Sequence, residues 1–167
     1  QALLPDCWIY VQERAVKMGR IQIFNNWSPY LVKDAENTVF LGLEYFCEEG
    51  DGMWNMSPEE WRNFGRKELI QMGILSSGAK IHLSHCEKVK KAYPAYFDTY
   101  AEMPKLRRWL DGIGNLYCIG RNGQHRYNNM DHSMLTAMTA VDCLFDEKKD
   151  RKAIWQVNTE KEYHEEG

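Results

Sequence analysis

Residues 115–138 hold an unusually dense group of hydrogen-bonding side chains. They are Arg121, Asn122, Gln124, His125, Arg126, Tyr127, Asn128, Asn129 and Asp131, and they lie between an apolar run at 115–119 and a helical pattern at 133–145. Free backbone N–H groups and the positive dipole end of a starting helix suit an anion or an electron-rich ring edge. The segment therefore predicts a site for a polar ligand, although Asn and Asp are also common helix caps, and arginines often pair with surface carboxylates.

Two histidines in this segment, His125 and His132, are candidates for proton transfer or for donation to a substrate, because histidine titrates near neutrality. Capping or support of a neighbouring group is an equally good interpretation of each. His82 and His85 have a spacing that could suit a metal, but no cluster of Cys, His or carboxylates accompanies them, so we expect no metal site.

The elements that must position these side chains follow from local patterns. Residues 8–11, 16–24 and 38–46 are rich in β-branched and aromatic residues and predict strands. Ser57, Pro58 and Glu60 form a capping-box signature for a helix over 58–72, which Gly73 should end. Further along, 80–91 is a weaker strand candidate, and 100–111 reads as a helix with Pro104 in its first turn or at a kink.

The C-terminal elements are expected as a strand at 115–119, a polar loop, and a buried helix at 133–145. That helix would place Met134, Met138, Val141 and Phe145 on one face. The tail from 146 to 167 is charged, but Ile154, Trp155 and Val157 predict that it packs partway back on the domain.

Gly120-Arg121, Tyr127 and Met130-Asp131, placed between an expected strand and the last helix, carry a resemblance to a known family. The segment resembles the C-terminal flavin-contacting motif of UDP-galactopyranose mutases and amine-oxidase relatives. Residues 92–96, with Tyr100 and a following helix, are similar to the family's return from substrate domain to FAD domain. The matching blocks span about residues 90–145, and the preceding aromatic strands suit a substrate-domain sheet.

The resemblance implies a FAD-dependent oxidoreductase in which the start of the last helix lies against the flavin. Backbone donors there would stabilise the negative charge of reduced flavin. The residues placed on the cofactor side are Gly120, Arg121, Tyr127, Asn129, Met130 and Asp131. No GxGxxG is present, so the chain reads as the C-terminal fragment of a larger parent, and we expect FAD in that parent but none bound by this fragment alone.

Three residues are predicted on the substrate side: Trp27, Tyr45 and Asn128. Trp27 and Tyr45 stand beside polar side chains, as in a substrate-orienting wall, although an exposed turn and plain core packing are the competing interpretations. In the mutases, tyrosines flanking the residue that matches Tyr127 hold a diphosphate, and here His125 and Asn128 stand in those places. This departure argues against mutase chemistry.

Composition limits the remaining classes of function. The 167 residues are 44% hydrophobic with a net charge of -3, and over the whole chain basic residues are interspersed with acidic ones, so we expect no nucleic-acid partner. No apolar run approaches the ~20 residues that span a bilayer, and no signal peptide is evident, which is typical of a cytoplasmic protein. The five cysteines, Cys7, Cys47, Cys86, Cys118 and Cys143, are expected to be reduced core residues.

The sequence thus predicts an α+β fold with a mixed or antiparallel substrate-domain sheet and helices, plus the returning strand and helix of a FAD domain. The expected domains are residues 1–97 and 98–167. Alternatives to the oxidoreductase are a nucleotide-sugar isomerase and a non-catalytic binding or assembly domain. A homodimer through the surface that the missing domain would cover is a further expectation.

Overall fold

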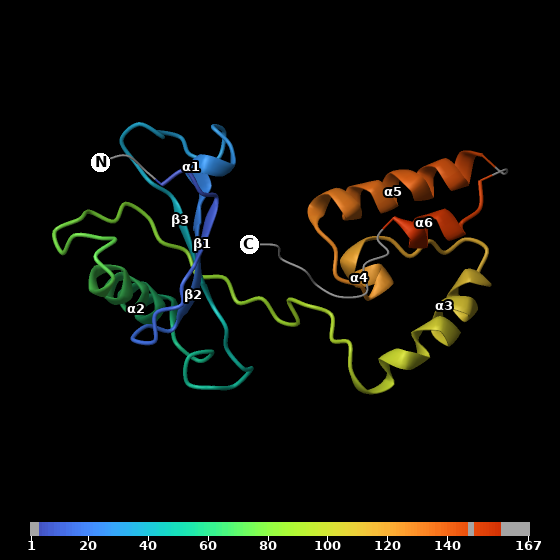
Figure 1. Cartoon of the computed structure of the whole chain (residues 1–167), viewed down its shortest axis with the longest axis horizontal. Helices are drawn as coiled ribbons and strands as arrows, with labels where there is room; N and C mark the ends of the chain where they lie inside the picture. The colour runs from blue at the N-terminus through green and yellow to red at the C-terminus, as the bar shows by residue number, and fades with distance from the viewer. Residues whose placement is uncertain (1–3, 147–148, 158–167) are drawn as a thin grey trace. The chain divides into compact units, whose positions relative to one another are not determined.

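The computed structural model, which describes residues 4–146 and 149–157, divides into two compact units, residues 1–90 and 91–167 (Figure 1). The first unit contains an antiparallel three-stranded sheet with helices, and the second is helical. The fold is α+β, as predicted. Residues 91–97, expected with the first domain, fall in the second unit, where Tyr93 stacks on Tyr127.

The sheet of the first unit has the order β1-β2-β3. Its strands are β1 (Trp8–Tyr10), β2 (Met18–Ile23) and β3 (Leu41–Tyr45), and both pairings are antiparallel. All three lie inside the predicted strand segments. A register shift between Met18 and Arg20 interrupts the alternation of β2, so that Met18 and Ile21 are both buried.

Two helices complete the first unit: the short α1 (Phe24–Trp27) and the longer α2 (Pro58–Gln71). The capping box of α2 is confirmed, because Glu60 N donates to Ser57 Oγ and Ser57 N donates to Glu60 Oε2. Leu69 of α2 packs with Val16, Met18 and Ile21 to form the core.

The weaker strand candidate at 80–91 is wrong, since this stretch has no regular secondary structure. None of its backbone groups appears in a ladder with β1, β2 or β3. With no partner strand, an extended segment cannot form sheet hydrogen bonds.

Gly73 ends α2 in a left-handed conformation, with φ of +73°. Ile74 N donates to Leu69 O and Gly73 N to Ile70 O, which is the Schellman pattern that satisfies the last carbonyls of a helix. A side chain at this φ is strained, so we expect Gly73→Ala to lower the free energy of unfolding by about 1 kcal/mol. Urea unfolding measures the change, and Gly78→Ala, at an open position without positive φ, is the control. Equal effects of the two substitutions would contradict the prediction.

The second unit contains the 3-10 helix η1 (Asp98–Glu102) and the helices α3 (Met103–Asp111), α4 (Gly120–Gln124), α5 (Met130–Phe145) and α6 (Lys152–Gln156). Pro104 lies in the first turn of α3, so the helix starts there and is not kinked. Ile154 and Trp155 of α6 are buried, which confirms that this part of the tail packs back. Residues 158–167 of the tail lie outside the described residues.

The predicted strand at 115–119 is wrong. No described strand of the second unit is available to pair with it, and its neighbourhood satisfies carbonyls in another way. The Arg151 guanidinium donates to Ile113 O at 3.2 Å and also to Leu116 O, and it lies 4.4 Å from the centre of the Tyr117 ring. The Arg151 side chain thus supplies the hydrogen-bond donors that a neighbouring strand would supply in a sheet.

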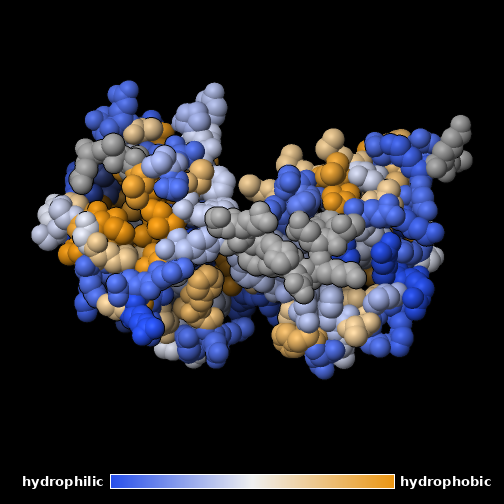
Figure 2. Space-filling view, viewed as in Figure 1, coloured by the Kyte–Doolittle hydropathy of each residue, from blue (hydrophilic) through white to orange (hydrophobic). Residues whose placement is uncertain are grey.

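The buried face predicted for the last helix is also wrong. The four predicted residues, Met134, Met138, Val141 and Phe145, are 66%, 64%, 53% and 83% exposed. Together with Met130, which is 80% exposed, they form what we call the α5 apolar face. The buried side of α5 consists instead of the small residues Thr136, Ala140 and Cys143, which let α6 approach. Figure 2 shows hydrophobic residues at the surface over α5.

The cysteines are free, but the expectation that all five are core residues is wrong. Cys143 is buried, whereas Cys7, Cys47, Cys86 and Cys118 are half-buried.

Candidate functional site

The polar residues of the second unit gather at the α4–α5 junction, residues 120–133. Gly120 begins α4 at φ of +68°, and its N–H donates to Thr136 Oγ1 of α5 at 3.0 Å. The five-residue α4 ends at His125, which adopts a left-handed conformation, and the chain is extended at Asn129 before α5 starts. The junction therefore brings the predicted cofactor-side residues to one end of α5.

Arg121 lies beside a pair of stacked tyrosine rings. Tyr93 and Tyr127 stack with an interplanar angle of 15°, and the Arg121 guanidinium lies 5.4 and 4.6 Å from their centres. Arg121 Nη2 donates to Asn128 O at 2.8 Å, and Nη1 donates to Ala92 O at 3.0 Å. Arg121 thus connects the 92–93 segment to the junction, and because Nε also donates to Asn128 O, three of its five N–H donors are engaged.

Two buried amides lie within the junction. Asn128 is 2% exposed, and its Oδ1 accepts from Ser133 Oγ at 2.9 Å. Gln124 is equally buried, and its Nε2 donates to Ile154 O at 2.9 Å. Asn128 Nδ2 and Gln124 Oε1 have no hydrogen-bond partner among the described residues, which is an unusual state for buried amide atoms.

Both candidate histidines have supporting contacts. His132 Nδ1 accepts from Asn129 N at 3.3 Å, in the arrangement of a capping box. The His125 ring lies 5.9 Å from that of Tyr100, and its Nε2 is 3.4 Å from Ala95 O. These contacts give each ring a structural role, and proton transfer by either histidine stays a prediction.

The first turn of α5 is accessible. Met130 is 80% exposed, and the side chain of Asp131 is 78% exposed. Tyr127 Oη donates to Asn129 Oδ1 at 3.3 Å, while Tyr127 N donates to the Tyr96 hydroxyl. Side chains from residues 92–96 therefore hold the turn in front of α5, and the helix start itself stays open.

Of the predicted substrate-side residues, Asn128 belongs to this junction, and Trp27 and Tyr45 belong to the first unit. Trp27 is 39% exposed and its ring is tilted against that of Trp8, with 5.1 Å between centres. Tyr45 packs against Trp61 and Phe64 of α2, and its hydroxyl donates to Glu68 Oε2 at 3.0 Å. Tyr45 therefore connects the sheet to α2.

Burial, together with the hydrogen bond to Glu68 and its negative charge, raises the pKa of Tyr45 above its ordinary value. The unfolded chain loses this proton above about pH 10, whereas the folded chain keeps it. The stabilisation that the raised pKa of Tyr45 gives the folded state is therefore fully present below pH 10. Above pH 10 it falls by up to about 1.4 kcal/mol per pH unit. We expect Tyr45→Phe to lose less stability than the wild type between pH 10 and 11 in urea titrations; parallel curves would contradict this.

Sequence reasoning missed Glu68 and Arg151. Glu68 is a charged residue on the apolar side of α2, one turn from Phe64 and from Met72, and that misplaced charge was the signal available. Arg151 had no such signal, because its carbonyl acceptors are about 35 residues away in the chain.

Two further findings limit the site. Across residues 4–146 and 149–157, no group of three or more His, Cys, Asp and Glu is arranged to hold a metal ion. No described helix combines the length and apolar character needed to cross a membrane.

Comparisons with protein-family models, with curated proteins and with solved structures find no match to this chain.

Proposed function

We propose that this chain is the flavin-side, C-terminal part of a FAD-dependent oxidoreductase related to amine oxidases. The observation that carries the proposal is the α4–α5 junction, where the residues that resemble the family's motif gather at the open start of a 16-residue helix. In the parent, the flavin would accept a hydride from a substrate that is not identified. The chain's residues would orient and stabilise the cofactor.

The residues present fit the ring edge of a flavin. The first-turn N–H groups of α5 and the remaining donors of Arg121 are donors, and the flavin edge near N1 and the C2 carbonyl is an acceptor. Met130 and Asp131 would lie beside it. The dinucleotide half of FAD finds no GxGxxG here and would need other parts of the parent.

The exposed hydrophobic residues are consistent with a chain that packs against another domain. Among the described residues, nine hydrophobic side chains are buried and 27 large ones are exposed. The α5 apolar face gathers five of these side chains on one helix, and a contiguous apolar patch is typical of an interface. In the proposed parent, the α5 apolar face would pack against the FAD domain, and without that domain it could form a homodimer.

The test is the flavin absorbance of the native full-length protein, purified without added cofactor. We expect a yellow protein in which Met130→Glu retains cofactor about tenfold more weakly, an effect of about 1.4 kcal/mol, because a second carboxylate at the helix start would compete for the first-turn N–H donors and repel the acceptor atoms of the flavin edge. Acidic residues are favoured in a first helical turn, so α5 should stay folded.

Arg108→Ala is the control, since Arg108 is exposed on α3. Arg121→Ala should also release flavin, but it removes contacts within the junction, which makes Met130→Glu the sharper variant. A colourless protein that fails to take up added FAD would refute the proposal and favour a binding or assembly domain.

A further inference from the structure

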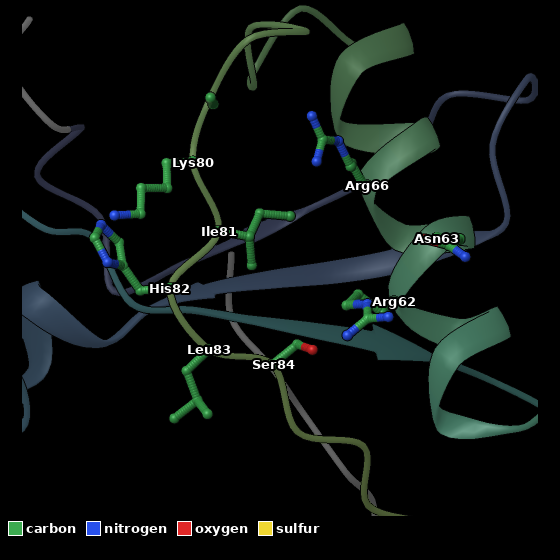
Figure 3. Close-up of a pocket in the computed structure, with 9 residues that line it drawn as sticks. Arg62, Asn63, Arg66, Lys80, Ile81, His82, Leu83 and Ser84 are labelled. Atoms are coloured by element: carbon green, nitrogen blue, oxygen red, sulfur yellow. The ribbon is translucent and has the colours of Figure 1, made fainter.

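The first unit contains a groove of about 530 Å³ between α2 and residues 79–84 (Figure 3). Its polar lining residues are Arg62, Asn63, Arg66, Lys80, His82 and Ser84. Figure 3 shows Arg62 and Arg66 projecting from α2 toward the segment, with Ile81 directed back at the helix and the Ser84 hydroxyl facing Arg62. Lys80 and His82 point to the other side of the segment.

The groove is positively charged. No Asp or Glu lines it, and residues 61–91 carry seven Lys and Arg but only two Asp and Glu, in a chain whose net charge is -3. One of those two acids, Glu68, is buried and hydrogen-bonded to Lys17 N, Met18 N and the Tyr45 hydroxyl. Basic residues are therefore in excess in this part of the chain, whereas over the whole chain they are interspersed with acidic ones.

Arg62 and Arg66 are one helical turn apart, and like charges at this spacing destabilise a helix. Arg66 Nη2 donates to Ser77 O at 2.7 Å, which holds the guanidinium over the groove with other donors remaining. Arg62 Nη2 is 3.5 Å from Glu59 Oε1, but both side chains are largely exposed, so this contact is weak. An anion bound between the two arginines would offset their repulsion.

The opposite wall adds backbone donors. No N–H group of residues 80–84 donates a hydrogen bond to another described residue. Residues 80–84 all line the groove, and Figure 3 shows the Ile81 side chain directed at α2, whereas Leu83 points to the other side of the segment. The wall thus offers backbone donors for phosphate oxygens beside the apolar side chain of Ile81 for the carbon part of a ligand.

We propose that this groove binds a small molecule carrying a phosphate or diphosphate, with the phosphate between Arg62 and Arg66. The volume lies in the range of small-molecule sites, about 300–1,000 Å³. Guanidinium groups recognise phosphate by paired, charge-assisted hydrogen bonds. The inference does not depend on the proposed flavin role, because it uses only residues of the first unit.

Isothermal titration of the 167-residue chain with pyrophosphate, ADP and adenosine tests the proposal. We expect pyrophosphate and ADP to bind, adenosine not to bind, and affinity to fall as salt is added. Arg62→Gln and Arg66→Gln should each weaken binding about tenfold, as the loss of a charge-assisted contact predicts. Tighter binding of ADP than of pyrophosphate would show that the groove also contacts the rest of a nucleotide.

Lys67→Gln is the matched control, because Lys67 is an exposed cation of α2 that does not line the groove. Thermal unfolding checks that each variant is folded, and Arg62→Gln keeps the test valid if loss of the Arg66–Ser77 bond disturbs the unit. The proposal is overturned if no phosphate compound binds, if adenosine binds as tightly as ADP, or if Lys67→Gln weakens binding as much as Arg62→Gln. The proposal is also overturned if RNA or anionic vesicles bind and all three substitutions weaken that binding equally. The binding site would then be a general basic surface and not the groove.

Discussion

Replacing Glu68 with alanine is expected to lower the free energy of unfolding of the first unit by about 3–4 kcal/mol. Glu68 is 4% exposed, and its carboxylate accepts from Lys17 N at 2.6 Å, Met18 N at 3.1 Å and the Tyr45 hydroxyl at 3.0 Å. One side chain of α2 thus satisfies donors at the start of β2 and at the end of β3. Its removal leaves the buried N–H of Met18 and the partly buried donors of Lys17 and Tyr45 without an acceptor and opens a cavity.

Urea unfolding followed by tryptophan fluorescence, with hydrogen exchange of β2 to assign the transition, measures the loss. The matched control is Glu59→Ala, because Glu59 is an exposed glutamate of the same helix and should change stability by no more than about 0.5 kcal/mol. Glu68→Gln keeps the shape but presents an NH₂ group to donors, so we expect an intermediate loss. If Glu68→Ala were as mild as Glu59→Ala, the carboxylate would have no role in joining helix and sheet.

The second large effect is expected at Trp155, where substitution by alanine should destabilise the second unit by about 3–5 kcal/mol. Trp155 is 7% exposed, its Nε1 donates to Asp111 Oδ1 at 3.0 Å, and the Arg107 guanidinium lies 4.7 Å from its ring centre. The residue therefore holds α6 against α3. Few other buried side chains are available to compensate, since the core of this unit is Ala140, Cys143 and Ile154.

Hydrogen exchange of α5 and α6 amides reads out this loss without interference from the first unit. Trp109→Ala is the control because Trp109 lies on α3 but is 66% exposed, and we expect a much smaller effect. Trp155→Phe keeps most of the packing and loses the bond to Asp111, so it should cost about 1 kcal/mol. Comparable protection in Trp155→Ala and Trp109→Ala would show that α6 does not stabilise the unit.

Features encoded within a few residues were readable from the sequence. The three strand segments, the capping box at Ser57, the stop at Gly73 and the start of α3 near Pro104 all lie where the patterns predict them. The polar segment at residues 115–138 is also visible in the sequence, but its role as a ligand site stays a prediction. Caps, turns and periodicity act over one or two turns of chain, so their physical causes lie next to one another in the sequence.

The partner of each surface was decided only by the tertiary structure. Residues 115–119 have the composition of a strand, but without a neighbouring strand their surroundings are held by Arg151 instead. The sequence does not reveal that Arg121 donates to the carbonyls of Ala92 and Asn128, and its contact with a cofactor stays a prediction. The apolar stripe of α5 predicted burial, whereas the buried side is the small-residue side. Burial and hydrogen-bond partners depend on chain segments tens of residues away. Local composition does not specify which of those segments packs against a given surface.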